Sequence, residues 1–297
     1  MEALPLVFFI YAFLGWCGEV AFAAIKEGAF VNRGFLNGPV CPIYGFGVFG
    51  VVTALRPVQD NLWLLYLGSA ALTTALEFVT GWVLEKIFHT RWWDYSDTPM
   101  SIMGYVCIPF SLLWGVACVV IVKLIHPMFL SMADRLLLWM CVSLDALFAL
   151  TFMLDLVATV IAVHKLSDRL SCITAAAGEL HAISDDIAYG IYDTTTAACE
   201  KTKAGAGAVR SRQAAAWTQI EARLSAIEKW LGEHRQQADA AAASIRRRFD
   251  TARSRARRAL NEKSYIQRRL VEAFPTMKSL RYQESLEILR RFYKRSE

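Results

Sequence analysis

The chain has 297 residues, of which 55% are hydrophobic, and a mean hydropathy of +0.33. This composition is more apolar than that of an average soluble protein. The charge is unevenly divided, since residues 1–163 hold seven Lys/Arg against 11 Asp/Glu, whereas residues 164–297 hold 25 against 16. We therefore expect an apolar domain, residues 1–163, followed by a basic domain, residues 164–297.

Five apolar segments are candidates for membrane-spanning helices, each of which needs ~20 mostly apolar residues. They cover residues 4–25, 39–55, 62–84, 102–125 and 136–163. The second segment is short and rich in glycine, so four spans with a re-entrant second segment are the alternative. The first segment lacks a basic n-region and is interpreted as a retained span. The predicted fold is an all-α polytopic membrane protein with about five transmembrane helices.

The Lys and Arg residues of the short loops predict the orientation in the cell membrane. One side holds the first and third loops and the residues that follow the fifth span: Lys26, Arg33, Lys86, Arg91, Lys165 and Arg169. The other side holds Arg56, Lys123 and Arg135. The excess of positive charge predicts that the N-terminus lies outside and that the C-terminal tail is cytoplasmic.

The tail has the apolar periodicity of helices. Apolar residues recur at seven-residue spacing in two interleaved series, Leu166, Ile173, Leu180 and Ile187 with Leu170, Ala177, Ser184 and Ile191. A second seam follows Gly205 and Gly207 and comprises Trp217, Ile220, Leu224, Ile227 and Leu231. An antiparallel helical hairpin and a self-associating coiled coil would each bury these seams.

Three carboxylates lie inside the predicted spans at similar depth. At ~1.5 Å per residue, Glu19, Glu77 and Asp155 each lie roughly 10 Å inside the cytoplasmic boundary. A charge at this depth is costly unless it faces a partner or a wet cavity, so these residues are candidates for a substrate site. The alternative is a structural role, in which each carboxylate caps or pairs with a neighbouring helix.

Two loops on the same predicted side have unusual sequences. Residues 30–47 contain glycines, prolines and aromatics, which suit irregular backbone that protein buries or that lines a water-filled cavity. The second loop contains paired tryptophans, which are also typical of an interfacial belt. We expect Arg33 to pair with Glu19 or Glu77. The candidate substrate-binding residues of the two loops are Asn32, Arg33, Asn37, Arg91, Trp92, Trp93, Asp94 and Tyr95.

The tail also contains a dense basic run. It comprises Arg246, Arg247, Arg248, Arg253, Arg255, Arg257 and Arg258. On a helix tethered to a bilayer, such residues could bind anionic lipid headgroups at ~1 kcal/mol each; a solvated helix face is the alternative. Nucleic-acid binding is not expected of a membrane-tethered chain.

Several recognised motifs are absent from the sequence. It has no phosphate-binding P-loop, no H-E-x-x-H and no G-x-S-x-G, so the chain is not expected to hydrolyse ATP itself. The seven cysteines have neither C-x-x-C nor zinc-ligand spacing. We therefore predict no cofactor, no metal and no disulfide framework, and the catalytic residues of any enzymatic activity stay undefined.

Distinctive motifs are spread over residues 8–127, and a further element lies near the C-terminus. They are Phe13–Trp16 with Glu19, Val31–Leu36, Cys41–Gly47, Leu76–Phe78 with Gly81 and Trp82, Glu85 and Lys86, Arg91–Ser96, Ser111 and Leu112 with Trp114 and Gly115, Ala273–Pro275 and Met277–Ser279. Together they resemble the bacterial type IV ABC-transporter (CmpB-type) family of membrane proteins. The resemblance implies a multi-pass permease.

The leading hypothesis is thus a permease-like transport protein with a polar site open to the cytoplasm. We expect it to form a homo-oligomer in the lipid bilayer, and a separate ATP-binding subunit if ATP drives transport. The alternative is a membrane-embedded enzyme or binding protein for a lipid or amphipathic substrate at the inner leaflet. A scaffold that acts through its tail is a third hypothesis.

Overall fold

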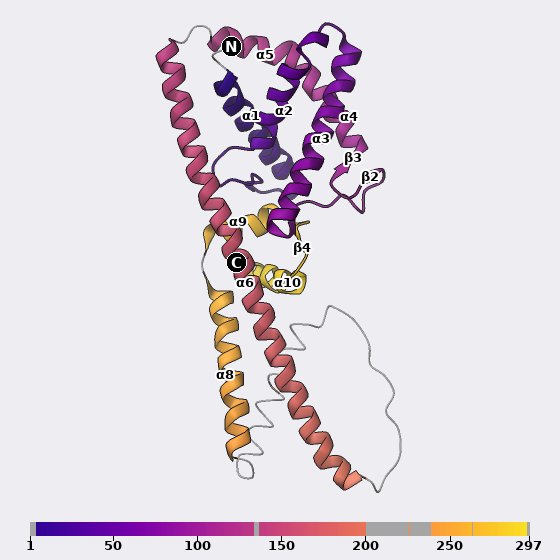
Figure 1. The fold of residues 1–297 in the computed structure, drawn as a ribbon, viewed down its shortest axis with the longest axis vertical. Coiled ribbons are helices and arrows are strands. Elements are labelled where there is room, and N and C mark those ends of the chain that lie inside the picture. Colours follow the sequence, from indigo (N-terminus) through magenta and orange to yellow (C-terminus); the bar gives the residue numbers. More distant parts are fainter. Residues whose placement is uncertain (1–3, 134–136, 200–224, 226–238, 263, 296–297) are drawn as a thin grey trace. The chain divides into compact units, whose positions relative to one another are not determined.

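The structure is a computed structural model that describes residues 4–133, 137–199, 225, 239–262 and 264–295 (Figure 1). It is almost entirely helical, which confirms the predicted all-α membrane fold. The chain divides into two compact units. The first comprises Met1–Leu166 and Ser264–Gln283, and the second comprises Ser167–Lys263 and Glu284–Glu297.

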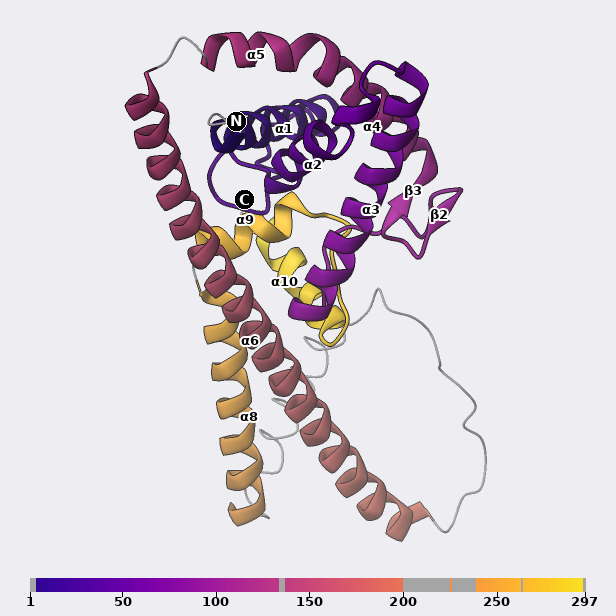
Figure 2. The same ribbon diagram turned by 45° about the horizontal axis from the view of Figure 1, so that its top comes forward.

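The first unit contains most of the elements. They are α1 (Leu4–Glu27), α2 (Pro42–Ala54), η1 (Arg56–Val58), α3 (Leu62–Phe88), β1 (Thr90–Arg91), β2 (Ser101–Ile102), β3 (Val106–Cys107), α4 (Ile108–Val120), η2 (Ile121–Ile125), α5 (His126–Ala133), the first part of α6 (Leu138–Cys199), α9 (Tyr265–Ala273) and β4 (Lys278–Ser279). Helices α1 to α4 pack side by side in both views (Figures 1 and 2).

Four helices in the described part of the chain are long and apolar enough to cross a bilayer: Pro5–Lys26, Leu62–Phe88, Ile108–Ser131 and Leu138–Tyr189. Helix α2 has 13 residues, which rise only about 20 Å. Because a hydrocarbon core is ~30 Å thick, α2 is shorter than a usual membrane-spanning helix. The prediction of about five apolar helices is confirmed, with a shorter second member.

The fourth helix begins at Ile108 rather than at residue 102 as predicted. Met103 and Gly104 adopt positive φ angles of 53° and 75°, a conformation that cannot continue a right-handed helix. Residues 101–107 instead form a hairpin in which β2 pairs antiparallel with β3. Pro109 then occupies the first turn of α4, where a missing backbone N–H is tolerated.

The C-terminal segment 264–283, called the strap below, belongs to the first unit. The Ser264 side chain caps α9 by accepting a bond from Gln267 N. Strand β4 then pairs antiparallel with β1, which places Thr90 opposite Ser279 and Arg91 opposite Lys278. Since β1 follows α3, the strap lies at the end of the helices that carries residues 28–41 and 89–107. We call this end the polar end.

In the second unit, the later part of α6 packs against α8 (Asp239–Asn261), and α10 (Gln283–Arg295) completes the unit. Ile183 and Ile187 of α6 bury Phe249 of α8. Arg169, near the start of this region, donates to the carbonyls of Ala259 and Leu260 at the far end of α8. The two helices are therefore antiparallel. The second predicted seam lies outside the described residues, so the hairpin and the self-associating coiled coil both stay predictions.

Candidate functional site

Two carboxylates predicted as site residues are hydrogen-bonded to tyrosine hydroxyls. The Tyr44 hydroxyl donates to Glu19 Oε1 at 2.5 Å, and the Tyr95 hydroxyl is hydrogen-bonded to Glu77. Glu19 and Glu77 are close enough for their charges to interact. Burial raises the pKa of Tyr95 above its ordinary value, and the charges of Glu77 and Glu19 raise it further. The tyrosine is therefore a neutral donor to the acids.

The third predicted carboxylate, Asp155 of α6, holds the loop between α1 and α2. Its Oδ1 accepts bonds from Asn37 N at 3.1 Å and Asn37 Nδ2 at 2.8 Å, and its Oδ2 accepts one from Gly38 N at 2.7 Å. A side chain at Gly38 would place its Cβ 3.2 Å from Oδ2, so glycine lets the backbone approach the acid. Asp155 thus fixes the loop by charge-assisted hydrogen bonds.

Asn32 organises the same loop from within. Its Oδ1 accepts bonds from Trp16 Nε1 at 2.7 Å and Gly34 N at 3.1 Å, while its Nδ2 donates to Asn37 O at 2.8 Å. These bonds leave the carbonyls of Asn32, Gly34 and Phe35 pointing to the strap. The loop is therefore an ordered structure whose carbonyl oxygens form an acceptor surface.

Arg269 of the strap occupies this acceptor surface. Its Nη1 donates to Gly34 O at 2.7 Å and Asn32 O at 3.3 Å, and its Nη2 donates to Phe35 O at 2.9 Å. The residue is only 6% exposed. Burial lowers the pKa of Arg269, and the negative charge of Asp155 opposes this effect. The chain therefore brings its own cation near Asp155.

Cys41 connects the two groups of acids. It is 5% exposed, its N–H donates to Ala12 O, and it lies within electrostatic range of both Glu19 and Arg269. We call the combined set the polar layer, which comprises Glu19, Tyr44, Glu77, Tyr95, Asp155 and Arg269. It holds three carboxylates and one guanidinium, brought together from α1, α2, α3, the 89–107 loop, α6 and the strap.

The predicted pairing of Arg33 with Glu19 or Glu77 is wrong. The Arg33 guanidinium lies over the Phe22 ring, 5.6 Å from its centroid, on a half-exposed part of α1. A cation at the membrane interface gains from an aromatic face without leaving water entirely. In the described residues, Arg33 forms no ion pair with either carboxylate, and Arg269 supplies the cation of the layer.

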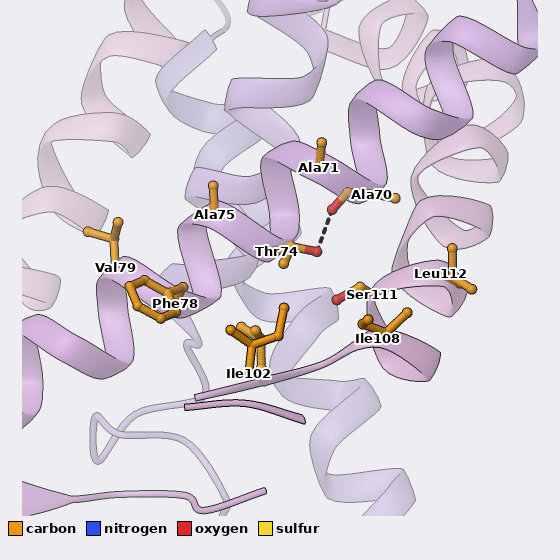
Figure 3. A pocket seen from close by; sticks show the side chains of 11 residues that line it. Ala70, Ala71, Thr74, Ala75, Phe78, Val79, Ile102, Ile108, Ser111 and Leu112 are labelled. Carbon is orange, nitrogen blue, oxygen red and sulfur yellow. Dashed lines mark hydrogen bonds between the residues drawn. The ribbon is translucent and has the colours of Figure 1, made fainter. Parts of the chain in front are cut away.

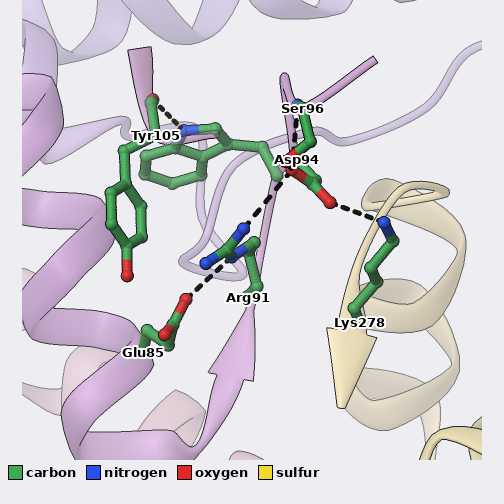
Figure 4. Close-up of polar contacts among 7 residues, drawn as sticks. Glu85, Arg91, Asp94, Ser96, Tyr105 and Lys278 are labelled. Carbon is green, nitrogen blue, oxygen red and sulfur yellow. Dashed lines mark hydrogen bonds and ion pairs between the residues drawn. The ribbon is translucent and has the colours of Figure 1, made fainter. Parts of the chain in front are cut away.

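Arg91 and Asp94 form a second network at the polar end (Figure 4). Arg91 Nε donates to Glu85 Oε2 at 2.8 Å, and Lys278 of the strap donates to Asp94 Oδ2 at 2.5 Å. Burial alone would raise the pKa of Asp94, but hydrogen bonds from Lys278 and Ser96 and the charge of Lys278 hold it well below its usual range. Asp94 is thus an ionised anchor for the strap.

The paired tryptophans have structural partners. Trp92 is 2% exposed and packs against Phe35, Phe88 and Phe274. Trp93 Nε1 donates to the carbonyl of Tyr105 at 2.8 Å. Trp92 therefore contributes an apolar contact between the loops and the strap, and Trp93 closes the 89–107 loop.

Gly104 is required by this second network, and its replacement gives a testable prediction. A Cβ at Gly104 would lie 2.6 Å from Ser96 Oγ and 2.7 Å from Asp94 Oδ1, whereas a Cβ at Gly28 would meet nothing within 4 Å. Both glycines have positive φ, so each alanine variant carries a similar backbone cost of ~1–2 kcal/mol. We expect Gly104→Ala to lower the free energy of unfolding by roughly 2 kcal/mol more than Gly28→Ala. Equal losses in thermal or denaturant unfolding would contradict this assignment.

An apolar groove lies beside α3 in the first unit (Figure 3). Its volume is about 460 Å³, and its walls are small and large, mostly apolar residues of α3, the β2–β3 hairpin and the start of α4. Ala71, Ala75 and Ile102 contribute to this lining, and Ser111 Oγ is bonded to Cys107 O. The chemistry of the groove suits a hydrocarbon chain rather than a polar solute.

The basic run of the tail lies on α8. Arg248 pairs with Asp186 at 2.9 Å and Arg255 with Glu179 at 3.5 Å, both on α6, and Arg253 lies over the Phe249 ring. At least two of the seven predicted lipid-binding arginines thus have carboxylate partners among the described residues of the second unit. Binding of lipid headgroups by the run stays a prediction.

Five residues that contact the predicted site residues were not predicted from the sequence: Tyr44, Glu85, Arg269, Lys278 and Thr159, whose Oγ1 accepts a bond from Asn37 Nδ2 at 3.0 Å. Tyr44, Glu85 and Lys278 lie within the motifs quoted above, so the resemblance marked their positions without their roles. No nearby sequence feature marked Arg269, because the residues that it binds are more than 230 positions away in the chain. Among the described residues, no group of three His, Cys, Asp or Glu side chains could hold a metal ion.

Comparison with known proteins gives one match. A family model with the description "Putative ABC-transporter type IV" matches residues 6–160, which is more than half of the chain. No curated protein and no solved structure matches the chain. The matched region contains Glu19, Glu77 and Asp155, together with the loops that bind them. The chain therefore belongs to the type IV ABC-transporter family and is a multi-pass protein of membrane transport.

Proposed function

We propose that the chain is the permease-like subunit of a transporter and that its polar layer opens to the cytoplasmic side. The observation that carries the proposal is the cluster of Glu19 and Glu77, whose described partners are tyrosine hydroxyls rather than cations. Acids without a paired cation are costly in a membrane. This cost favours a role for Glu19 and Glu77 in binding a transported solute.

The distribution of positive charge supports the proposed orientation. The polar end carries positive residues from the loops and from the strap, whereas the opposite end carries Arg56 and Lys123 among the described residues. Those of the polar end are Lys26, Arg33, Lys86, Arg91, Arg268, Arg269, Lys278 and Arg281. Because Lys and Arg are retained on the cytoplasmic side, we place the polar end and the tail in the cytoplasm and the N-terminus outside.

Glu77→Gln is expected to abolish transport while the protein still inserts and assembles. Loss of one charged hydrogen bond to a solute costs ~1.5–3 kcal/mol, which corresponds to a roughly tenfold or larger loss of flux. Untargeted mass spectrometry of cells with and without the chain identifies the compound that differs, and the variant should reproduce the profile of the deletion. The control is Asp97→Asn, which removes an exposed acid from the 89–107 loop. A wild-type profile with Glu77→Gln would contradict the proposal.

A second candidate function is the binding or modification of a lipid or another amphipathic molecule at the inner leaflet. The apolar groove between α3 and α4 supports it, since its lining suits an acyl chain. The paired tryptophans do not, because Trp92 is buried against Phe35 and Phe274 rather than available to headgroups. The permease is therefore the better supported of the two.

Purification of the intact complex in mild detergent separates these functions. Mass spectrometry of the proteins and of the bound small molecules is the measurement. A stoichiometric ATP-binding subunit would support the permease. Self-association alone, with a retained lipid, would favour the lipid-binding alternative and would support the expected homo-oligomer.

A further inference from the structure

The strap covers the polar layer with a cation of its own. Arg269 donates to three loop carbonyls and lies near Asp155, an arrangement like that of a bound guanidinium compound in an acceptor-lined site. Its Nε is buried without a hydrogen-bond partner in the described residues. An arginine with only a structural role would be more stable if its Nε also donated a hydrogen bond.

Several contacts hold the strap. Besides the bonds of Arg269, they include the two-residue pairing of β4 with β1, the ion pair of Lys278 with Asp94, and the contact of Phe274 with Trp92. Lys278 is 51% exposed on its side chain, so its ion pair is accessible to water. The strap also buries Leu270, Val271, Ala273 and Met277, so its opening would expose these residues together with Arg269.

The position of the strap in the chain allows its opening to be controlled. The residues immediately before it and after it, up to Lys263 and from Glu284, belong to the second unit. The strap is therefore tethered at both ends to a different compact unit. A change in the second unit, such as the binding of a partner, would act directly on the strap through the chain.

We propose that the strap is a latch, in which Arg269 is a tethered cation that closes the cytoplasmic end of the polar layer. A free cation of the guanidinium class competes with Arg269 for the carbonyls of residues 32–35. This inference rests on the proposed function, since it assigns a positively charged substrate class to the polar layer. Three carboxylates against one guanidinium leave the layer with acceptor capacity for such a cation.

Labelling of Cys41 tests the latch without any transport assay. The protein is prepared with Cys41 as its single cysteine, after replacement of Cys17, Cys107, Cys118, Cys141, Cys172 and Cys199. Wild-type Arg269 should keep Cys41 slow to react with a hydrophilic maleimide. Arg269→Ala should raise the rate roughly tenfold or more, as expected when charged hydrogen bonds that hold a segment are removed. Loss of a nearby cation makes a thiol less reactive, so a faster reaction reports access.

Arg268→Ala is the matched control, because Arg268 is the adjacent residue of α9 and pairs with Glu272 on its exposed side. It should label at the wild-type rate. Arg269→Gln, which retains hydrogen-bond donors, should label at an intermediate rate and serves as the second variant if Arg269→Ala does not fold. Wild-type labelling of a folded Arg269→Ala or Arg269→Gln protein would overturn the latch.

Methylguanidinium tests the assigned class of cation. Added to the Arg269→Ala protein, it should slow the labelling of Cys41 towards the wild-type rate, whereas the same concentration of a sodium salt should not. If the variant labelled faster but methylguanidinium gave no protection, the proposal that a free cation competes with Arg269 would be overturned. Because neither measurement depends on flux, a failure of the proposed transport function would be seen separately, in the metabolite profiles of the Glu77 variant.

Discussion

Replacing Gly15 with alanine is expected to prevent α1 and α2 from packing as they do in the structure. A Cβ at Gly15 would overlap the Cβ and Cγ atoms of Tyr44, which lie next to the backbone of α2 and cannot move as the tip of a side chain can. The same tyrosine donates to Glu19, so its displacement also breaks the first bond of the polar layer. We expect a loss of about 3 kcal/mol in the free energy of unfolding, the upper part of the range for overpacking.

Gly18→Ala is the control for this prediction. Gly18 lies on the same helix, and a Cβ there would meet nothing within 4 Å. Since alanine favours helix over glycine by ~1 kcal/mol, the control should be neutral or stabilising. Thermal unfolding in detergent gives the comparison. Similar midpoints for the two variants would mean that α1 and α2 do not pack through Gly15.

Much of the fold could be predicted from the sequence because its main signal is local. Runs of apolar residues define α1, α3, α4 and α6, and a bilayer permits only backbone that is internally bonded. The hairpin at residues 101–107 was missed for a physical reason. Its sequence is apolar enough to extend a span, and only the left-handed φ angles at Met103 and Gly104 end the helical path.

The candidate site was predicted in part. Intramembrane acids are expensive, so Glu19, Glu77 and Asp155 could be identified from their position alone. The partner of a buried charge is a tertiary feature. The predicted topology suggested Arg33 as the cation near the acids, whereas Arg269 fills this role from the opposite end of the chain. The uneven charge of the sequence also placed the strap in the tail, whereas it belongs to the first unit. An amphipathic helix such as α9 gives no indication of the surface that it covers.

The strap belongs to the tail in sequence and to the first unit in space. Its residues 273–279 belong to the element that the resemblance marked, and they place Ala273 and Met277 in the buried interior of the first unit. The same element carries Lys278, which binds Asp94 beside Arg91. A tail that contributes buried residues to the membrane unit cannot be removed without exposing that unit, which argues against a scaffold whose membrane part is only an anchor.

Replacing Asp155 with alanine is expected to release the loop that Arg269 covers. The amide groups of Asn37 and Gly38 would lose a charged acceptor, and Arg269 would lose its nearby negative charge. Breaking such a partly buried, charge-assisted set costs on the order of 3 kcal/mol in the free energy of unfolding. In the single-cysteine protein, the variant should also label Cys41 faster than wild type.

Asp145→Ala provides the contrast on the same helix. Its Oδ1 is buried with no hydrogen-bond partner in the part of the chain that the structure describes. Removing an unsatisfied buried carboxylate relieves a desolvation cost, so this variant should be neutral or stabilising. Denaturant unfolding of both variants in the same detergent measures the difference. If Asp145→Ala lost as much stability as Asp155→Ala, the loss would reflect the removal of any acid from α6, and the specific role of Asp155 in holding residues 37 and 38 would be excluded.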